Sequence, residues 1–161
     1  MINQGIMSSA TPEWPTPQWL FDALDSVYHF TLDPCSTHEN AKCEKHFTKE
    51  DDGLSLSWKG ERVFMNPPYG KEIFKWVQKC FQEFILDRDD GVCKVALLPS
   101  RTDTRWFHGY VLGFAEIHFI NGRLKFGDGK GSAPFPSLVA AWGGDHRDFR
   151  EMSKVLLRIG R

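Results

Sequence analysis

Four consecutive residues, Asn66-Pro67-Pro68-Tyr69, carry the clearest chemical signal in the sequence. Two prolines in succession fix the backbone and remove two amide donors, which leaves carbonyl oxygens free to accept hydrogen bonds. The side-chain oxygen of Asn66 and the carbonyl of Pro67 could accept both hydrogens of a planar amine and hold its nitrogen toward an electrophile. Tyr69 adds a flat face on which a nucleic-acid base could stack. The loop predicts chemistry at an exocyclic amine by positioning, without a metal or a general base.

Three apolar runs in the chain each lead into a polar residue. The runs are 30–32, 62–65 and 92–98, and the polar residues after them are Asp33, Asn66 and Arg101. Each run is short and bounded by turn residues, which is typical of a strand. In open, mostly parallel sheets, ligands bind beyond the carboxyl ends of the strands. We therefore expect these three side chains at one edge of a sheet, where they form a site.

Segments with helical spacing separate the predicted strands. Apolar residues recur at three- and four-residue intervals after Pro17, which predicts a helix with Thr16 as its N-cap and Pro17 in its first turn. A second helix is expected after Gly70, and a terminal helix at 145–161. The tryptophans of these segments are expected in core or rim packing rather than as stacking platforms for bases.

Two further strands are expected near the end of the chain. They cover 116–120 and 137–142, and a Gly-rich, partly basic connection at 127–134 suits a hairpin between them. The alternation of strands and helices predicts the α/β class, with a mostly parallel sheet and a C-terminal antiparallel hairpin.

Length and composition limit the architecture and the setting. A chain of 161 residues, 41% of them hydrophobic, supports one domain, expected at 12–161 behind a loose polar leader at 1–11. No apolar run reaches the roughly 20 residues of a membrane helix, and no signal peptide opens the chain. The four cysteines are expected as reduced thiols in the cytoplasm. A net charge of −1 means that any surface for nucleic acid must be a local patch.

Several ordered motifs together resemble the phage-type DNA N-6-adenine methyltransferases, from about Trp14 to Trp142. The matching stretches are 14–17, 32–35, 40–41, 52–54 with Trp58, 66–70, 98–102, 122–126 and 133–135. The resemblance implies a compact methyltransferase-type Rossmann fold, S-adenosylmethionine as methyl donor, and the amino group of adenine in DNA as acceptor. It also implies base flipping, because a stacked adenine cannot reach the donor, and a bacterial or phage-infected cell as the setting.

The same resemblance implies which residues bind the cofactor. Thr16 and Pro17 match the segment that contacts the methionine part of the cofactor. Asp33, with Pro34 and Cys35, matches the tip of the first strand, where the acidic side chain meets the cofactor's ammonium group. Asn66 borders the same cofactor, and either Asp51 or Asp52 reaches its ribose or adenine.

Two features set this chain apart from larger methyltransferases. The turn after Asp33 lacks their Gly-rich sequence, and the segment from Asp33 to Arg62 is short for two full βα units. We therefore expect one or two strands to be missing or vestigial.

Contacts to DNA phosphates are expected from two basic segments. They are the loop 99–106, with Arg101 and Arg105, and the connection 122–134, with Arg123, Lys125 and Lys130. The sequence gives no prediction of oligomeric state or of the DNA sequence recognised.

Two alternatives stay open at this point. Cys35, His38, Cys43 and His46 have the spacing of a compact zinc knuckle, which would indicate a nucleic-acid-binding module without catalysis. The second alternative keeps the fold and the loop but changes the acceptor to an RNA base or to the amide of a protein glutamine, because the same acceptor geometry suits any planar amine.

Overall fold

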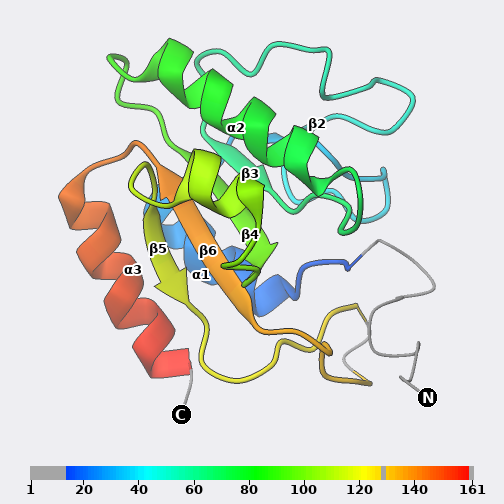
Figure 1. Cartoon of the computed structure of the whole chain (residues 1–161), viewed down its shortest axis with the longest axis vertical. Coiled ribbons are helices and arrows are strands. Elements are labelled where there is room, and N and C mark those ends of the chain that lie inside the picture. The colour runs from blue at the N-terminus through cyan, green and yellow to red at the C-terminus, as the bar shows by residue number, and fades with distance from the viewer. Residues whose placement is uncertain (1–13, 128–129, 160–161) are drawn as a thin grey trace.

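The computed structural model describes residues 14–127 and 130–159, and the expected leader at 1–11 lies outside this part of the chain. The described residues form one six-stranded sheet with helices on both faces (Figure 1). The strands are β1 (Leu32–Asp33), β2 (Lys45–His46), β3 (Val63–Met65), β4 (Lys94–Pro99), β5 (Glu116–Phe119) and β6 (Ser137–Trp142). The helices are α1 (Gln18–Tyr28), α2 (Ile73–Asp87), the π-helix η2 (Phe107–Val111) and α3 (His146–Ile159).

The strand order is β2-β1-β3-β4-β6-β5. β1 pairs in parallel with β2 and β3, and β3 pairs in parallel with β4. β6 alone runs the other way, between β4 and β5, and pairs antiparallel with both. The predicted α/β class and the mostly parallel sheet with an antiparallel C-terminal pair are therefore confirmed.

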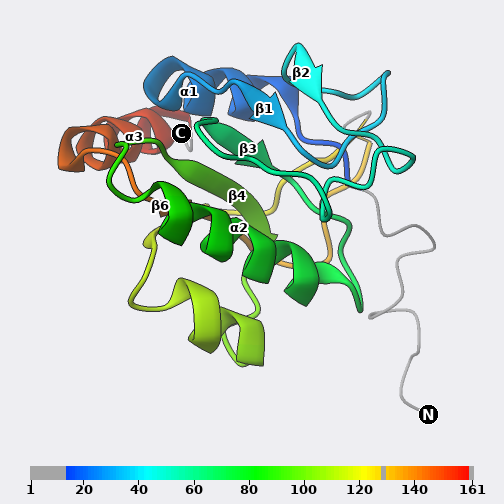
Figure 2. The same cartoon turned by 90° about the horizontal axis from the view of Figure 1, so that it is seen from above.

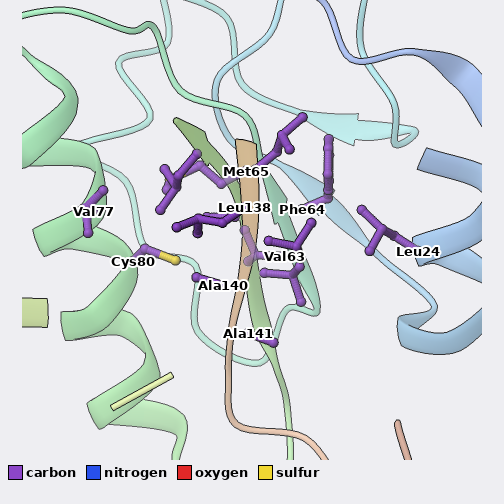
Figure 3. Packing of buried hydrophobic residues seen from close by; sticks show 14 of the residues in the cluster. Leu24, Val63, Phe64, Met65, Val77, Cys80, Leu138, Ala140 and Ala141 are labelled. Carbon is purple, nitrogen blue, oxygen red and sulfur yellow. The ribbon is translucent and has the colours of Figure 1, made fainter. Parts of the chain in front are cut away.

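Helices cover the two faces of the sheet separately. α1 packs beside α3 on one face, whereas α2 packs on β4 and beside η2 on the other (Figure 2). All residues of β4 and β6 are buried, because both faces of these central strands are covered. Figure 3 shows Leu24 of α1 on one side of the strands and Val77 and Cys80 of α2 on the other. No helix of the described residues is long and apolar enough to cross a membrane.

The structure corrects the expected start of α1. Its N-cap is Pro17 rather than Thr16, and no side chain caps the helix. The Thr16 hydroxyl instead accepts a hydrogen bond from Asn66. β2 and η2 were not expected, since two paired residues and a single five-residue π-helix leave no periodic pattern in a sequence.

Candidate active site

A cavity of about 380 Å³ opens at the carboxyl edge of the sheet, between β1 and β3. From β1 the chain continues to β2, which lies on one side of β1, and then to β3, which lies on the other side. The space between the ends of β1 and β3 is therefore the switch point at which open α/β sheets bind ligands. The cavity has walls from both loops after these strands, from the segment before α1 and from the start of α2. Its predicted site residues are Thr16, Asp33, Cys35, Asp52, Asn66, Pro67 and Pro68.

The Asn66 amide is held in one orientation. Its Nδ2 donates to the backbone oxygen of Trp14 at 2.6 Å and to the Thr16 hydroxyl at 2.9 Å. Because a carbonyl oxygen only accepts hydrogen bonds, the nitrogen of the amide must face Trp14. Asn66 Oδ1 is then a buried acceptor without a partner in the described structure. A buried acceptor costs free energy unless a partner binds it, which marks this atom as a position for a donor.

Tyr69, the last residue of the loop, is buried. Its side chain is 7% exposed, its hydroxyl donates to the Leu97 backbone oxygen at 3.1 Å, and its burial raises the pKa of the phenol. The rings of Phe126 and Phe135 pack against it at centroid distances of 6.4 and 5.4 Å. In this arrangement the ring is part of the core, and stacking of a base on Tyr69 stays a prediction.

The Asp33 carboxylate lies at the tip of β1 and is 4% exposed. It accepts hydrogen bonds from the backbone amides of Lys42 at 3.0 Å and Cys35 at 3.4 Å. Burial raises the pKa of Asp33, although these two amides and the charges of His46 and Lys42 act in the opposite direction. The cavity therefore contains a poorly solvated carboxylate, whose ionised form a cationic ligand would stabilise.

Cys35 connects the two loops that form the cavity. Its thiol donates to the Asn66 backbone oxygen at 3.4 Å, and burial raises its pKa well above the usual value. His38 and His46 contact each other instead, with 2.9 Å between Nδ1 and Nε2. Among residues 14–127 and 130–159, no three His, Cys, Asp or Glu side chains are arranged as metal ligands. The geometry thus gives the zinc-knuckle alternative no support.

The two candidate aspartates of the cofactor site differ in position. Asp51 accepts hydrogen bonds from the amide and hydroxyl of Thr48, which lower its pKa, and it does not line the cavity. Asp52 lines the cavity and is exposed. The next residue, Gly53, lies so close to Pro34 that a Cβ there would be 2.1 Å from the Pro34 oxygen. The chain thus needs glycine where this segment meets the turn after β1.

The remaining predicted residues do not line the cavity. Pro17 and Pro34 are buried behind it. The predicted DNA contacts are all exposed and follow strands whose ends lie at the carboxyl edge; they are Arg101, Arg105, Arg123, Lys125 and Lys130. Lys42, Glu72 and Trp76 line the cavity without having been predicted. Asn40 also lines the cavity. Its place in the stretch 40–41, which matches the methyltransferase family, could have indicated this position.

Comparison with known proteins identifies the class of protein that this fold and site define. The family described as DNA N-6-adenine-methyltransferase (Dam) matches residues 6–152. The chain therefore belongs to the DNA N-6-adenine-methyltransferase family.

Two phage proteins are similar to the chain over most of its length. The DNA N-6-adenine-methyltransferase of Haemophilus phage HP1 (strain HP1c1) is 31% identical over 116 residues, which cover 70% of this chain. The DNA N-6-adenine-methyltransferase of Escherichia phage T1 is 32% identical over 114 residues, or 69% of this chain. The matched regions span 65% and 45% of these two relatives.

Proposed function

We propose that this protein transfers a methyl group from S-adenosylmethionine to the exocyclic amino group of adenine in DNA. The observation that carries the proposal is the unpartnered Asn66 Oδ1, fixed at the wall of a cavity at the sheet's switch point. The names of the two phage relatives support the same reaction. We place this activity in the cytoplasm of a bacterial or phage-infected cell, and we assign the six-stranded sheet, in which β2 has only two residues, to a compact methyltransferase-type Rossmann fold.

The chemistry of the cavity wall fits S-adenosylmethionine. Asp33 offers a buried carboxylate for the ammonium group, and Asp52 offers exposed oxygens for ribose hydroxyls. Thr16 borders the same space. The cofactor supplies a methyl group activated by a sulfonium, and no metal takes part in this proposal.

The protein's contribution to the transfer is mainly the position of the amine. Asn66 Oδ1 and the Pro67 carbonyl accept the two amine hydrogens, which orients the nitrogen toward the methyl group. The locked amide needs no rearrangement when the amine arrives, because Trp14 and Thr16 already hold it. The adenine must leave the base stack to reach this position.

RNA and the amide of protein glutamine are the rival acceptors, since the loop chemistry is the same for all planar amines. The exposed cations after β4 and β5 favour a polyanion over a protein side chain. The named activity of both relatives favours DNA over RNA.

The test is transfer of labelled methyl from S-adenosylmethionine to unmethylated plasmid DNA, with RNA and protein acceptors in parallel. Nucleoside analysis should find the label in methylated adenine from DNA, and the Asn66→Ala variant should give almost none. Label in RNA or protein would keep the site and replace the substrate, whereas no label in any acceptor would refute the reaction.

The Asp33→Asn substitution should weaken cofactor binding about 10- to 100-fold at neutral pH, because a hydrogen bond between charged groups contributes about 1.5–3 kcal/mol. Burial raises the pKa of Asp33, and only the ionised carboxylate pairs with an ammonium group. Cofactor affinity should therefore be highest above this raised pKa and should decrease as the pH falls through it. The decrease should begin at a higher pH than the ordinary aspartate pKa of about 3.9 would give.

Calorimetric titration of the cofactor at several pH values measures both effects. The exposed Asp89→Asn variant, at the far end of α2, is the matched control and should follow the wild type. A wild-type affinity that does not change on acidification would contradict the role of Asp33, as would wild-type binding by the Asp33→Asn variant.

A further inference from the structure

A second hollow of about 830 Å³ lies between α1, β5 and α3, separate from the cavity at the switch point. We call it the β5 groove. The described residues that line it are Trp19, Ile117, His118, Phe119, Ile120, Asn121, Arg123, Leu124, Lys125, Phe149, Ser153 and Leu156.

The lining of the β5 groove combines apolar surface with positive charge. Trp19 and Phe119 are 44% and 64% exposed, which is high for rings of this size. Arg123 and Lys125 are the charged residues among the described lining, and this lining includes no carboxylate. His118, also in the wall, is buried with no hydrogen-bond partner at Nε2. Aromatic surface together with cations is the combination that binds a nucleic-acid strand.

The groove adjoins the proposed active site through two shared segments. β5 runs parallel to β4, because both pair antiparallel with β6, so its last residue lies at the same edge as the catalytic loop. Leu124 lines the groove, and Phe126, two residues later, packs on Tyr69. Trp19 follows Thr16 by three residues, and Thr16 holds the Asn66 amide.

We propose that the β5 groove binds the DNA strand next to the extruded adenine. Arg123 and Lys125 contact phosphates there, and Trp19 and Phe119 contact the face of a flanking nucleotide. This inference rests on the proposed function and adds a surface outside the cavity to it. Charge complementarity and the shared segments favour a nucleic-acid strand over a second copy of the chain, whose net charge is −1.

The test uses duplexes that carry a methylation site mapped in the transfer assay, trimmed stepwise on either side of the target adenine. Binding is measured by fluorescence anisotropy for the Trp19→Ala/Phe119→Ala double variant and for Arg123→Ala. The matched controls are Leu86→Ala and Arg88→Ala, because both residues are exposed at the far end of α2. Cofactor affinity and melting temperature verify that each variant is folded.

The double variant should bind the long duplex about fivefold more weakly or worse, which is the lower end for loss of a stacked base. Arg123→Ala should lower the slope of log affinity against log salt by about 1. Both effects should disappear when the duplex is trimmed on the side that contacts the groove, and they should persist when it is trimmed on the other side. The controls should match the wild type.

Equal affinity of the variants and the wild type for the long duplex would overturn the inference, as would a loss that persists on every trimmed duplex. A wild-type dimer in sedimentation that the double variant abolishes would assign the groove to a second copy instead. Failure of the proposed function is distinguishable, because the wild type would then transfer no methyl to DNA in the first place.

Discussion

Replacing Asn66 with alanine should slow methyl transfer by about 100- to 1000-fold, the usual effect of removing one preorganised hydrogen-bonding group from an active site. The variant loses Asn66 Oδ1, the buried amide acceptor of a cavity-lining residue that has no partner in the described structure. Cofactor affinity should change far less, because the Asp33 carboxylate is untouched. Single-turnover kinetics with DNA and calorimetric titration with S-adenosylmethionine separate the two quantities.

The neighbours of Asn66 provide a sharper version of this experiment. Asn66→Asp has the same shape but places a carboxylate oxygen where Nδ2 now lies, 2.6 Å from the Trp14 carbonyl oxygen. We expect this variant to be slow too, because two acceptors cannot share that contact. Thr16→Val removes the other contact and should lower the rate, whereas Thr16→Ser keeps the hydroxyl and should restore it. A fast Asn66→Asp variant would show that the amide orientation does not matter.

The central part of the fold was predictable because burial on both faces leaves a direct mark on the sequence. The apolar run 92–98 corresponds to β4 and the run 137–142 to β6, and both are buried throughout. The edge strand β2 escaped prediction because Lys45 and His46 form a strand only through pairing with β1. Pairing with a distant segment is a tertiary effect that local periodicity does not record.

The site could be predicted where a residue's place follows from a strand end. Asp33 and Asn66 line one cavity for this reason, whereas Arg101, which was expected in the same site, does not line it. The position of Tyr69 could not be predicted, since it depends on Phe126 and Phe135, more than fifty residues later. That Asp52 rather than Asp51 lines the cavity could not be predicted either, because the Asp51 carboxylate is held by hydrogen bonds from Thr48.

A buried ion pair between the end of α2 and the start of β4 was not predicted either. Lys94 and Asp87 are fully buried, with 2.7 Å between Nζ and Oδ2. Lys94 also donates to the Glu61 backbone oxygen at 2.7 Å, and Asp87 accepts from the Gly60 amide at 2.8 Å. Trp58 joins this cluster to the cavity, because its backbone oxygen accepts a hydrogen bond from Lys94 Nζ at 3.4 Å and its indole nitrogen donates to the Gly53 oxygen at 2.9 Å. The pair thus fixes the segment that begins at the cavity with Gly53.

The Lys94→Met substitution should destabilise the protein by about 3–5 kcal/mol, because it leaves the Asp87 carboxylate buried without its cation. Chemical denaturation of the cofactor-free protein measures this loss. The Lys94→Met/Asp87→Leu double variant is the control, and it should recover much of the stability because it replaces the whole pair with apolar side chains. A single variant as stable as the wild type would contradict the structural role of the pair.

The dependence of this loss on pH identifies its cause. Burial alone would raise the pKa of Asp87, but the hydrogen bonds from Lys94 and Gly60 hold it below the ordinary value. The stabilisation is therefore complete above the unfolded pKa of about 3.9 and is lost as the pH falls through the lower folded value. In Lys94→Met, burial raises the pKa of Asp87, so the difference between wild type and variant should begin to shrink as the pH falls through that raised value and should continue to shrink down to the lowered wild-type value. The pair also fixes the segment that follows Gly53. Lys94→Met should therefore bind S-adenosylmethionine more weakly at neutral pH. The Lys94→Met/Asp87→Leu double variant should regain that affinity along with its stability.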